Sequence, residues 1–393
     1  MITAGLILTS GAVFFQGYAH FAFLAFVFLV SIYCIFNAHV ITINQRYLIA
    51  VLSITLCIFV TMTLKSDFGR FYSYSNFALH IFIAAFIPLL FRFKDVATAY
   101  SNIIVFLAIS SLVIYVCLVF YPGIAANFSK INGLTDFSYF NLFLYVVPET
   151  GFNGRNYSIF WEPGAFQAFL FLALLFECYI FSFKRHWQSV VLLIALLTTR
   201  STTAYIMLAI LGSYVSLMGK SFGVSRSLRA SIMILGSICI FNPYFYDVIQ
   251  SKFVEGNTSS GIRLVSTVSD LMIFSKSIIY GVGYSLYDSL IPIVSFDMFY
   301  LELGGTVNSF TYTLSVFGLL FFFPILYIYY LFAKRTTGKR LDSIIVFFLI
   351  LIIFSTENFM TSLLWLSLGF YGLLHSIRRN PYRVTSYPVR DRV

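Results

Sequence analysis

Long apolar runs recur along the whole chain and constrain its fold more strongly than any other feature of the sequence. A helix needs about 20 apolar residues to cross a bilayer, because the hydrocarbon core is roughly 30 Å thick. The clearest runs occupy residues 47–64, 97–121, 163–183, 309–333 and 341–358. Shorter or broken runs occupy residues 2–15, 18–36, 76–91, 188–200, 203–219, 230–243 and 359–375. The pattern predicts an all-α fold, a polytopic transmembrane helix bundle of about 12 spans in a single integral membrane domain over residues 1–393.

The composition also favours a lipid environment. Hydrophobic residues make up 60% of the chain and charged residues only 10%, which leaves too little polar surface to cover a water-soluble globule of this size. The net charge is +10, but the basic residues stand in short clusters between the apolar runs. Such clusters are typical of membrane topology signals, so we expect the lipid bilayer and no nucleic acid as a partner. Because the cysteines lie inside apolar runs and the histidines are scattered, the sequence predicts no disulfide framework, no metal site and no other cofactor.

The basic clusters also orient the chain, because short loops rich in lysine and arginine stay on the cytoplasmic side during insertion. If the basic tail at residues 376–393 is cytoplasmic, alternation of the spans puts both termini and most of the 25 basic residues on that side. No charged side chain precedes Arg46. The N-terminal run is therefore predicted to be a retained span rather than a cleaved signal peptide.

Two predicted outer segments, residues 122–162 and residues 244–308, are far longer than a turn requires. Loops of such length are usually functional or disordered. Both segments are rich in aromatic and aliphatic residues, which favours folding over the outer mouth of the bundle. Within the second segment, residues 262–276 are predicted to form an interfacial helix, with Arg263, Thr267 and Asp270 on one face.

The first outer segment ends in a polar stretch that leads directly into a strong apolar run. Pro163 suits the first turn of a helix, so Arg155 and Glu162 are expected at a helix N-terminus, a location that favours anions. The alternative is that Arg155 anchors the chain at the membrane interface and that Glu162 caps the helix dipole. Three neighbouring side chains are candidates for substrate contact: Asn156, Tyr157 and Trp161.

A hydroxyl-rich break at residues 198–204 contains Arg200, with Ser201 and Thr202 beside it. A charged side chain this close to hydrocarbon is costly unless it pairs, faces water or extends to the interface, so a functional role is the default hypothesis. The alternative is a side chain that only extends to the interface.

The second outer segment adds glycines and an asparagine to the candidates. Gly281 and Gly283, followed by Tyr284, permit either a tight turn or close approach of the backbone to a ligand. Asn308 precedes the next apolar run, where it is either a substrate ligand or a helix cap.

The order of these features resembles that of the Wzy-type O-antigen and capsule repeat-unit polymerases. The matching features are Arg155 with Phe160, Glu162, Pro163 and Gly164 opening a span, the break at residues 201–203, Arg263 and residues 281–284 in a second large outer segment, and Asn308 leading into a span with Gly318. The resemblance covers residues 150–325 in detail and the whole chain in topology.

The resemblance implies a metal-independent glycosyltransferase of the GT-C class in the inner membrane of a bacterium. Such an enzyme transfers a growing glycan from undecaprenyl diphosphate to another lipid-linked repeat unit, with a chain-length regulator protein and a flippase as partners. Arg155 and Arg263 would bind diphosphate or sugar, and Arg200 is a third candidate. Glu162, or another outer acid, would then orient and deprotonate the acceptor hydroxyl, while the arginines stabilise the leaving diphosphate.

Two other functions compete with the polymerase. A flippase for lipid-linked oligosaccharides, or another transporter, would have a similar number of spans, but it should carry charges inside its spans and have short loops. An O-antigen ligase is expected to have a histidine in the second outer segment, and this chain has none between His186 and His375.

Overall fold

The computed structural model describes residues 2–13, 25–30, 43–132, 138–218, 258–299, 303, 306 and 308–379. Its main helices, in chain order, are α1 (Ile2–Gly11), α4 (Gln45–Leu64), α5 (Phe71–Leu90), α6 (Phe93–Phe120), α7 (Pro163–Tyr179), α8 (His186–Thr198), α9 (Thr202–Met218), α12 (Thr258–Ser275), α13 (Tyr284–Phe299), α14 (Ser309–Thr337), α15 (Arg340–Thr356) and α16 (Leu363–Arg379). Two 3-10 turns, η2 (Phe68–Arg70) and η3 (Pro122–Asn127), and three short strands complete the described elements.

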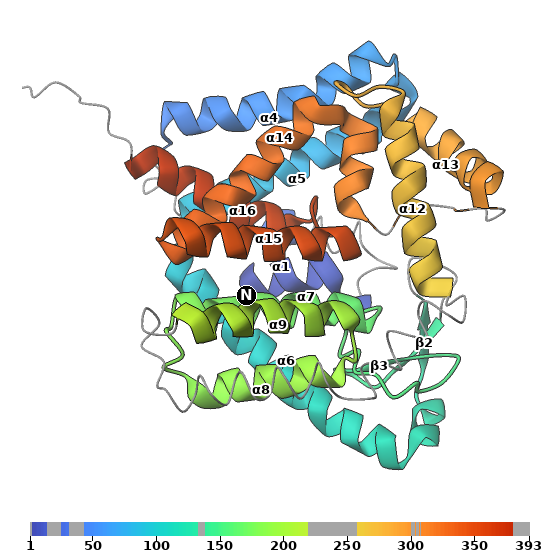
Figure 1. Ribbon diagram of the computed structural model, residues 1–393, viewed down its shortest axis with the longest axis vertical. Coiled ribbons are helices and arrows are strands. Elements are labelled where there is room, and N and C mark those ends of the chain that lie inside the picture. The colour runs from blue at the N-terminus through green and yellow to red at the C-terminus, as the bar shows by residue number, and fades with distance from the viewer. Residues whose placement is uncertain are drawn as a thin grey trace, which may run out of the picture.

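The helices form one bundle, and the described parts of both long segments lie at the same end of it. Figure 1 shows α4, α7, α8, α9 and α15 running across the view, while α12, α13, β2 and β3 lie together at the right-hand end. We call this the loop end of the bundle. Four described helices are long and apolar enough to cross a membrane: α4, α6, α14 and the segment Phe68–Leu90, which consists of η2 and α5. By length and composition, these are the helices of a membrane protein.

The apolar runs predict the positions of the helices well. Ten of the predicted spans coincide with α1, α4 to α9 and α14 to α16, usually within a few residues at each end. The run at residues 18–36 lies largely outside the described residues, and the run at residues 230–243 lies wholly outside them. The all-α class is confirmed, whereas the total of twelve spans and the GT-C-like architecture stay predictions. Helix α16 continues to Arg379, so the first residues of the predicted tail at residues 376–393 are helical.

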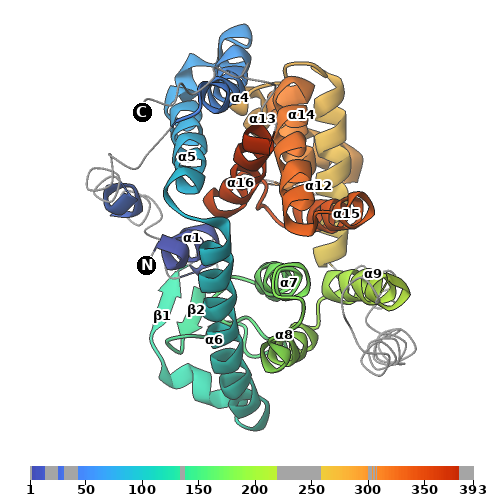
Figure 2. The same cartoon turned by 90° about the vertical axis from the view of Figure 1, so that its left-hand side faces the viewer.

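Helix α7 is the most deeply enclosed helix among those described. Every residue from Pro163 to Cys178 is buried, as expected for a helix that is apolar on all sides. In Figure 2 it lies among α6, α8 and α9, and the hydroxyl of Tyr100 on α6 donates to the carbonyl oxygen of Phe169 at 3.0 Å. Because α7 is enclosed by other helices, its N-terminus is held in a fixed position at the loop end.

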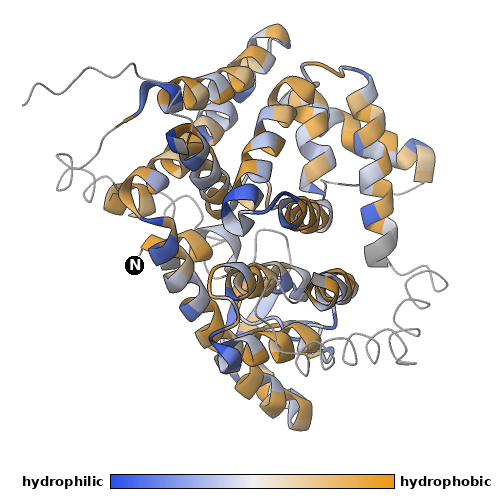
Figure 3. Cartoon of the chain, turned by 60° about the vertical axis from the view of Figure 1, so that its left-hand side comes forward, coloured by the Kyte–Doolittle hydropathy of each residue, from blue (hydrophilic) through white to orange (hydrophobic). Residues whose placement is uncertain are grey.

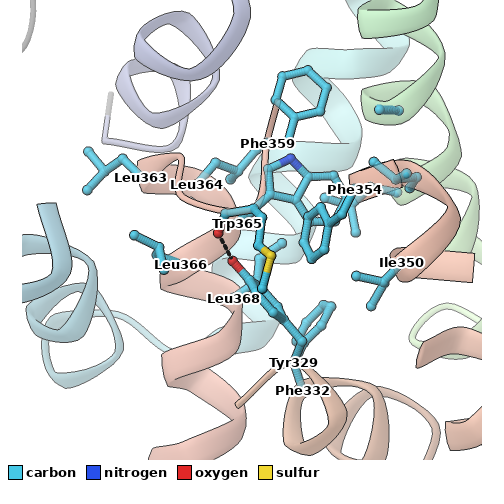
Figure 4. Close-up of a cluster of buried hydrophobic side chains, with 14 of the residues drawn as sticks. Tyr329, Phe332, Ile350, Phe354, Phe359, Leu363, Leu364, Trp365, Leu366 and Leu368 are labelled. Atoms are coloured by element: carbon cyan, nitrogen blue, oxygen red, sulfur yellow. Dashed lines mark hydrogen bonds between the residues drawn. The ribbon is translucent and has the colours of Figure 1, made fainter. Parts of the chain in front are cut away.

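A second buried cluster joins α14, α15 and α16. Trp365 is fully buried between Phe354 and Phe359, with ring centroids 5.3 and 6.3 Å away, and Tyr329 donates to the carbonyl oxygen of Met360 at 2.5 Å (Figure 4). Apolar residues are frequent along most of the helices (Figure 3), and many of them are exposed. Large exposed side chains on α4 and α6 include Leu52, Leu56, Phe106, Val113 and Val116. A soluble protein rarely exposes so much apolar surface, so these faces are suited to lipid.

The first long segment folds into a small antiparallel sheet of order β1-β2-β3, formed by Lys130–Asn132, Ser138–Asn141 and Val146–Pro148. Tyr139 on β2 and Tyr145, just before β3, are buried and donate to the main chain of the segment before α7. The hydroxyl of Tyr145 binds the carbonyl oxygen of Arg155, and that of Tyr139 binds the carbonyl oxygen of Trp161, both at 3.0 Å. The sheet therefore fixes the approach to α7.

The second long segment is also ordered where it is described. Helix α12 covers the interfacial helix predicted for residues 262–276, and in Figure 1 it stands across the ends of α14 and α15. Its polar face is directed into the protein, where Asp270 accepts hydrogen bonds from the hydroxyls of Tyr287, Thr306 and Thr311. Burial raises the pKa of Asp270 to about 6.

Candidate functional site

Three arginines and two glutamates meet at the loop end, beside the start of α7. We call them the arginine–glutamate cluster: Arg155, Glu162, Arg200, Arg263 and Glu357. They come from four separate segments: the chain before α7, which carries Arg155 and Glu162, the α8–α9 connection, α12 and the α15–α16 connection. The cluster therefore exists only in the folded bundle.

Arg263 lies at the centre of the cluster, between the two glutamates. Its Nη2 atom is 3.3 Å from Oε1 of Glu357 and 3.6 Å from Oε2 of Glu162. The side chains of Arg263 and Glu162 are 28% and 30% exposed, whereas that of Glu357 is 1% exposed. The cluster thus has a buried carboxyl side and a side that reaches solvent.

Arg155 has no acidic partner within ion-pair distance among the described residues, whereas Arg263 has two. The Nε of Arg155 donates to the carbonyl oxygen of Thr199 at 3.1 Å. Loss of solvent lowers the pKa of Arg155, and Arg263 lowers it further, whereas Glu162 and Glu357 oppose this shift. A partly desolvated guanidinium without a counter-ion is suited to binding an anion.

Arg200 approaches the same stretch of chain from the α8–α9 connection. It has a left-handed backbone conformation with φ of 49°, which turns the chain between the two helices. Gly154 also has a positive φ, and a Cβ atom on it would lie 3.0 Å from Nη1 of Arg200. Gly154 thus leaves room for Arg200 next to Arg155.

Glu357 is the member of the cluster that sequence reasoning did not assign to the site. It follows α15 directly, in a polar break between two apolar runs, and an acid in such a position is a signal of function that could have found it. Gly164, the second residue of α7, explains how it enters the cluster. A Cβ atom on Gly164 would overlap Oε1 of Glu357, so a glycine after Pro163 admits the carboxyl to the positive end of α7.

Asn308 and Ser309 hold the two halves of the cluster together. The side chain of Asn308 caps α14 by accepting from the amides of Phe310 and Thr311. It also donates to Thr267 of α12 at 3.1 Å, and Thr267 in turn donates to the carbonyl oxygen of Arg263. Asn308 was predicted as either a substrate ligand or a cap, and the structure shows the cap.

Ser309 fixes the chain on both sides of Glu357. Its hydroxyl lies 2.8 Å from the carbonyl oxygen of Glu357 and 2.9 Å from that of Phe354, and it accepts from the amide of Met360. The start of α14 therefore positions Arg263 through Asn308 and Glu357 through Ser309.

The residues predicted to contact substrate before α7 and at the α8–α9 connection differ in burial and in their bonds to the protein. Asn156 is fully buried, and its side chain donates to Ser111 and Thr198 and accepts from the amide of Ser158. Tyr157 and Ser201 are also buried, and Thr202 is the first residue of α9. The sequence puts these residues beside the arginines, but it does not show that the side chain of Asn156 is bonded within the protein. Trp161 is partly exposed, with its ring 5.5 Å from that of Phe359.

The glycines of the second long segment do not belong to the cluster. Gly281 has a φ of +67°, and its position is so close to the backbone of Val316 that no side chain would fit. The amides of Val282 and Gly283 donate to the carbonyl oxygens of Ser315 and Val316 at 2.8 and 3.0 Å. The close approach predicted for these glycines is therefore an approach to α14, at the point where Gly318 interrupts it. Tyr284 packs there as well, with its ring 5.4 Å from that of Phe317.

The cluster is suited to holding a polyanion rather than a metal. It combines three guanidinium groups with two carboxyls, so positive charge is in excess. Among the residues that the structure describes, no group of three or more His, Cys, Asp or Glu side chains could hold a metal ion. No family model matches the chain, and no curated protein sequence matches it.

Proposed function

We propose that this protein is a membrane glycosyltransferase that joins oligosaccharide repeat units carried on undecaprenyl diphosphate. The observation that carries the proposal is Arg155, a partly buried guanidinium with no acidic partner within ion-pair distance among the described residues, beside Arg263 at the loop end. The resemblance to Wzy-type polymerases, in the order of Arg155, Glu162 and Arg263 along the chain, supports the choice of substrate.

In this proposal the arginines and Glu162 have different roles. Arg155 and Arg200 bind the diphosphate of the donor, because guanidinium binds phosphate through two parallel hydrogen bonds and stays charged when partly desolvated. Glu162, part-exposed at the start of α7, accepts the proton of the acceptor hydroxyl as it attacks the sugar. The arginines stabilise the negative charge that develops on the leaving lipid diphosphate.

The test replaces Arg155 by Ala and by Lys in the source bacterium after removal of the native gene. Loss of one charge-stabilising donor typically lowers the rate by about 10²-fold or more, so R155A should reduce surface polysaccharide to single repeat units. Lysine keeps the charge but not the paired hydrogen bonds, so R155K should give chains of intermediate length. Gel analysis of the surface polysaccharide is the measurement.

The matched control is Arg70, which pairs with Asp288 on the exposed surface at 2.5 Å. Because exposed ion pairs contribute little to stability, R70A should leave the chain-length distribution unchanged. Undiminished long chains in R155A would refute the proposal. Complete loss of surface repeat units after removal of the gene, rather than single units, would support the flippase instead.

A further inference from the structure

We propose that Glu162 and Glu357 form a carboxyl pair that holds one proton, with Arg263 between them, and that Glu357 is a positioning residue for the site. The identity of the bound anion rests on the proposed function, whereas the shared proton does not depend on that function. The charge state of this pair decides how strongly the arginine–glutamate cluster attracts an anion.

The geometry of Arg263 is the first support. A single atom, Nη2, lies within ion-pair distance of both carboxyls, so one guanidinium has to balance two acids. When two carboxyls share one site, ionisation of one disfavours ionisation of the other. The pair therefore tends to keep a proton.

The burial of Glu357 decides which carboxyl keeps the proton. Glu357 is enclosed to 1% exposure, whereas Glu162 retains 30%, so solvent stabilises a charge only on Glu162. Oε2 of Glu357 has no hydrogen-bond partner among the described atoms. A proton on this oxygen would turn a buried, unpartnered acceptor into a hydrogen-bond donor.

The charges that face Glu357 agree with this assignment. Among the described residues they are Arg263 on α12 and Glu162 at the start of α7, with Arg155 somewhat farther away. Burial raises the pKa of Glu357 well above its usual range, Glu162 raises it further, and Arg263 opposes the shift. The balance favours a neutral Glu357 at neutral pH.

A neutral Glu357 matches the cluster to its proposed ligand. Three arginines and one ionised glutamate leave two positive charges in excess. A diphosphate joined to a lipid at one end and to a sugar at the other carries one negative charge on each phosphate. Ionisation of Glu357 would remove half of the excess charge and weaken the attraction for this diester.

The first experiment measures the proton directly on the full-length protein in detergent micelles. Infrared spectra of wild type and E357Q should differ at pH 7 by the carbonyl band of a protonated carboxyl, and this band should lose intensity as the pH rises. E162Q removes the neighbouring charge, so it should shift the titration of the band to lower pH.

The matched control is E177Q, which replaces a buried glutamate at the opposite end of α7 and should leave the Glu357 titration unchanged. Thermal unfolding of each variant checks that it is folded, and E162Q tests the coupling even if E357Q is unstable. An ionised Glu357 at pH 7, or a titration that E162Q does not move, would overturn the shared proton.

The second experiment measures binding of P1,P2-dimethyl diphosphate, a diester with no proton to lose near neutral pH. Binding to wild type should weaken by about tenfold once Glu357 is ionised, a change equivalent to one pKa unit, whereas binding to E357Q should not vary over this pH range. Equal pH dependence in wild type and E357Q would overturn the positioning role. Absence of binding to every variant, with the infrared result intact, would instead refute the proposed function.

Discussion

At Gly164, the absence of a side chain decides whether Glu357 reaches the start of α7. A Cβ atom at this position would meet the Glu357 carboxyl, and it would lie 3.6 Å from Nη2 of Arg263. The proline and glycine that follow Glu162 thus have separate tasks. Pro163 starts the helix, and Gly164 makes space for an acid that arrives from a distant part of the chain.

This space gives a prediction for G164A. The added methyl group should push Glu357 away from Arg263, so repeat-unit polymerisation should fall well below that of the wild type. Stability should fall by about 1–3 kcal/mol, as is usual for an overpacked site. The measurements are gel analysis of surface polysaccharide and thermal unfolding of the purified protein.

The matched control is Gly261 in α12, where a Cβ atom would meet nothing within 4 Å. Alanine is favoured over glycine in a helix by roughly 0.5–1 kcal/mol, so G261A should retain full activity and unfold at the same or a slightly higher temperature. Normal polysaccharide in G164A would show that polymerisation does not require Glu357 to lie beside Arg263.

At the scale of elements, α14 is two helical pieces joined at Gly318. This residue has φ of 66° and ψ of −171°, a conformation that is essentially restricted to glycine. The amides of Leu319 and Leu320 donate to the carbonyl oxygens of Ile278 and Ile279 at 2.9 and 3.0 Å. The break thus lets the chain before α13 bind the backbone of α14, and it joins the second long segment to the bundle.

This junction gives a prediction for G318A. Alanine has to adopt a strained backbone conformation, and its Cβ atom would overlap the backbone of Ile279. We expect a loss of about 3 kcal/mol or more in the free energy of unfolding, measured as the change in thermal midpoint in detergent.

Gly338 provides the control, because it also has a positive φ, +72°, but nothing lies within 4 Å of its Cβ position. It ends α14 in the left-handed conformation typical of a helix C-terminus. G338A should cost about 1 kcal/mol, so the additional loss in G318A reports the overlap with the backbone of Gly281 and Ile279 together with the glycine-restricted conformation at Gly318. Equal losses in both variants would contradict the proposed junction.

At the scale of the whole molecule, the sequence predicts the helices better than it predicts the site. Long apolar runs determine helix positions locally, which explains why α6, α7 and α14 coincide with predicted spans. The pairing of Arg263 with Glu357 joins residues 94 positions apart, and nothing in the local pattern specifies it. The neighbour of Gly281 is unspecified for the same reason. The local sequence indicates a close approach of the backbone, but it does not distinguish a ligand from α14 as the neighbour.

The orientation of the molecule in the membrane gives the final prediction. The described parts of both long segments lie at the loop end (Figure 1), whereas Lys94, in the first turn of α6, and Lys339, between α14 and α15, lie beside short connections at the opposite end. Since short basic connections are retained in the cytoplasm, the loop end should face outwards. Single cysteines would be placed at Lys130 and Ser289 in the long segments and at Lys94 and Lys339, in a chain whose own cysteines are replaced by alanine.

A membrane-impermeant thiol reagent should label the first two cysteines in cells whose plasma membrane is intact, and the last two only after that membrane is permeabilised. All four side chains are exposed, so burial does not explain a failure to react. Labelling of the two long segments from opposite sides would contradict the bundle itself. Labelling of both from the cytoplasm would keep the bundle but would put the arginine–glutamate cluster on the wrong side for a polymerase of exported glycan.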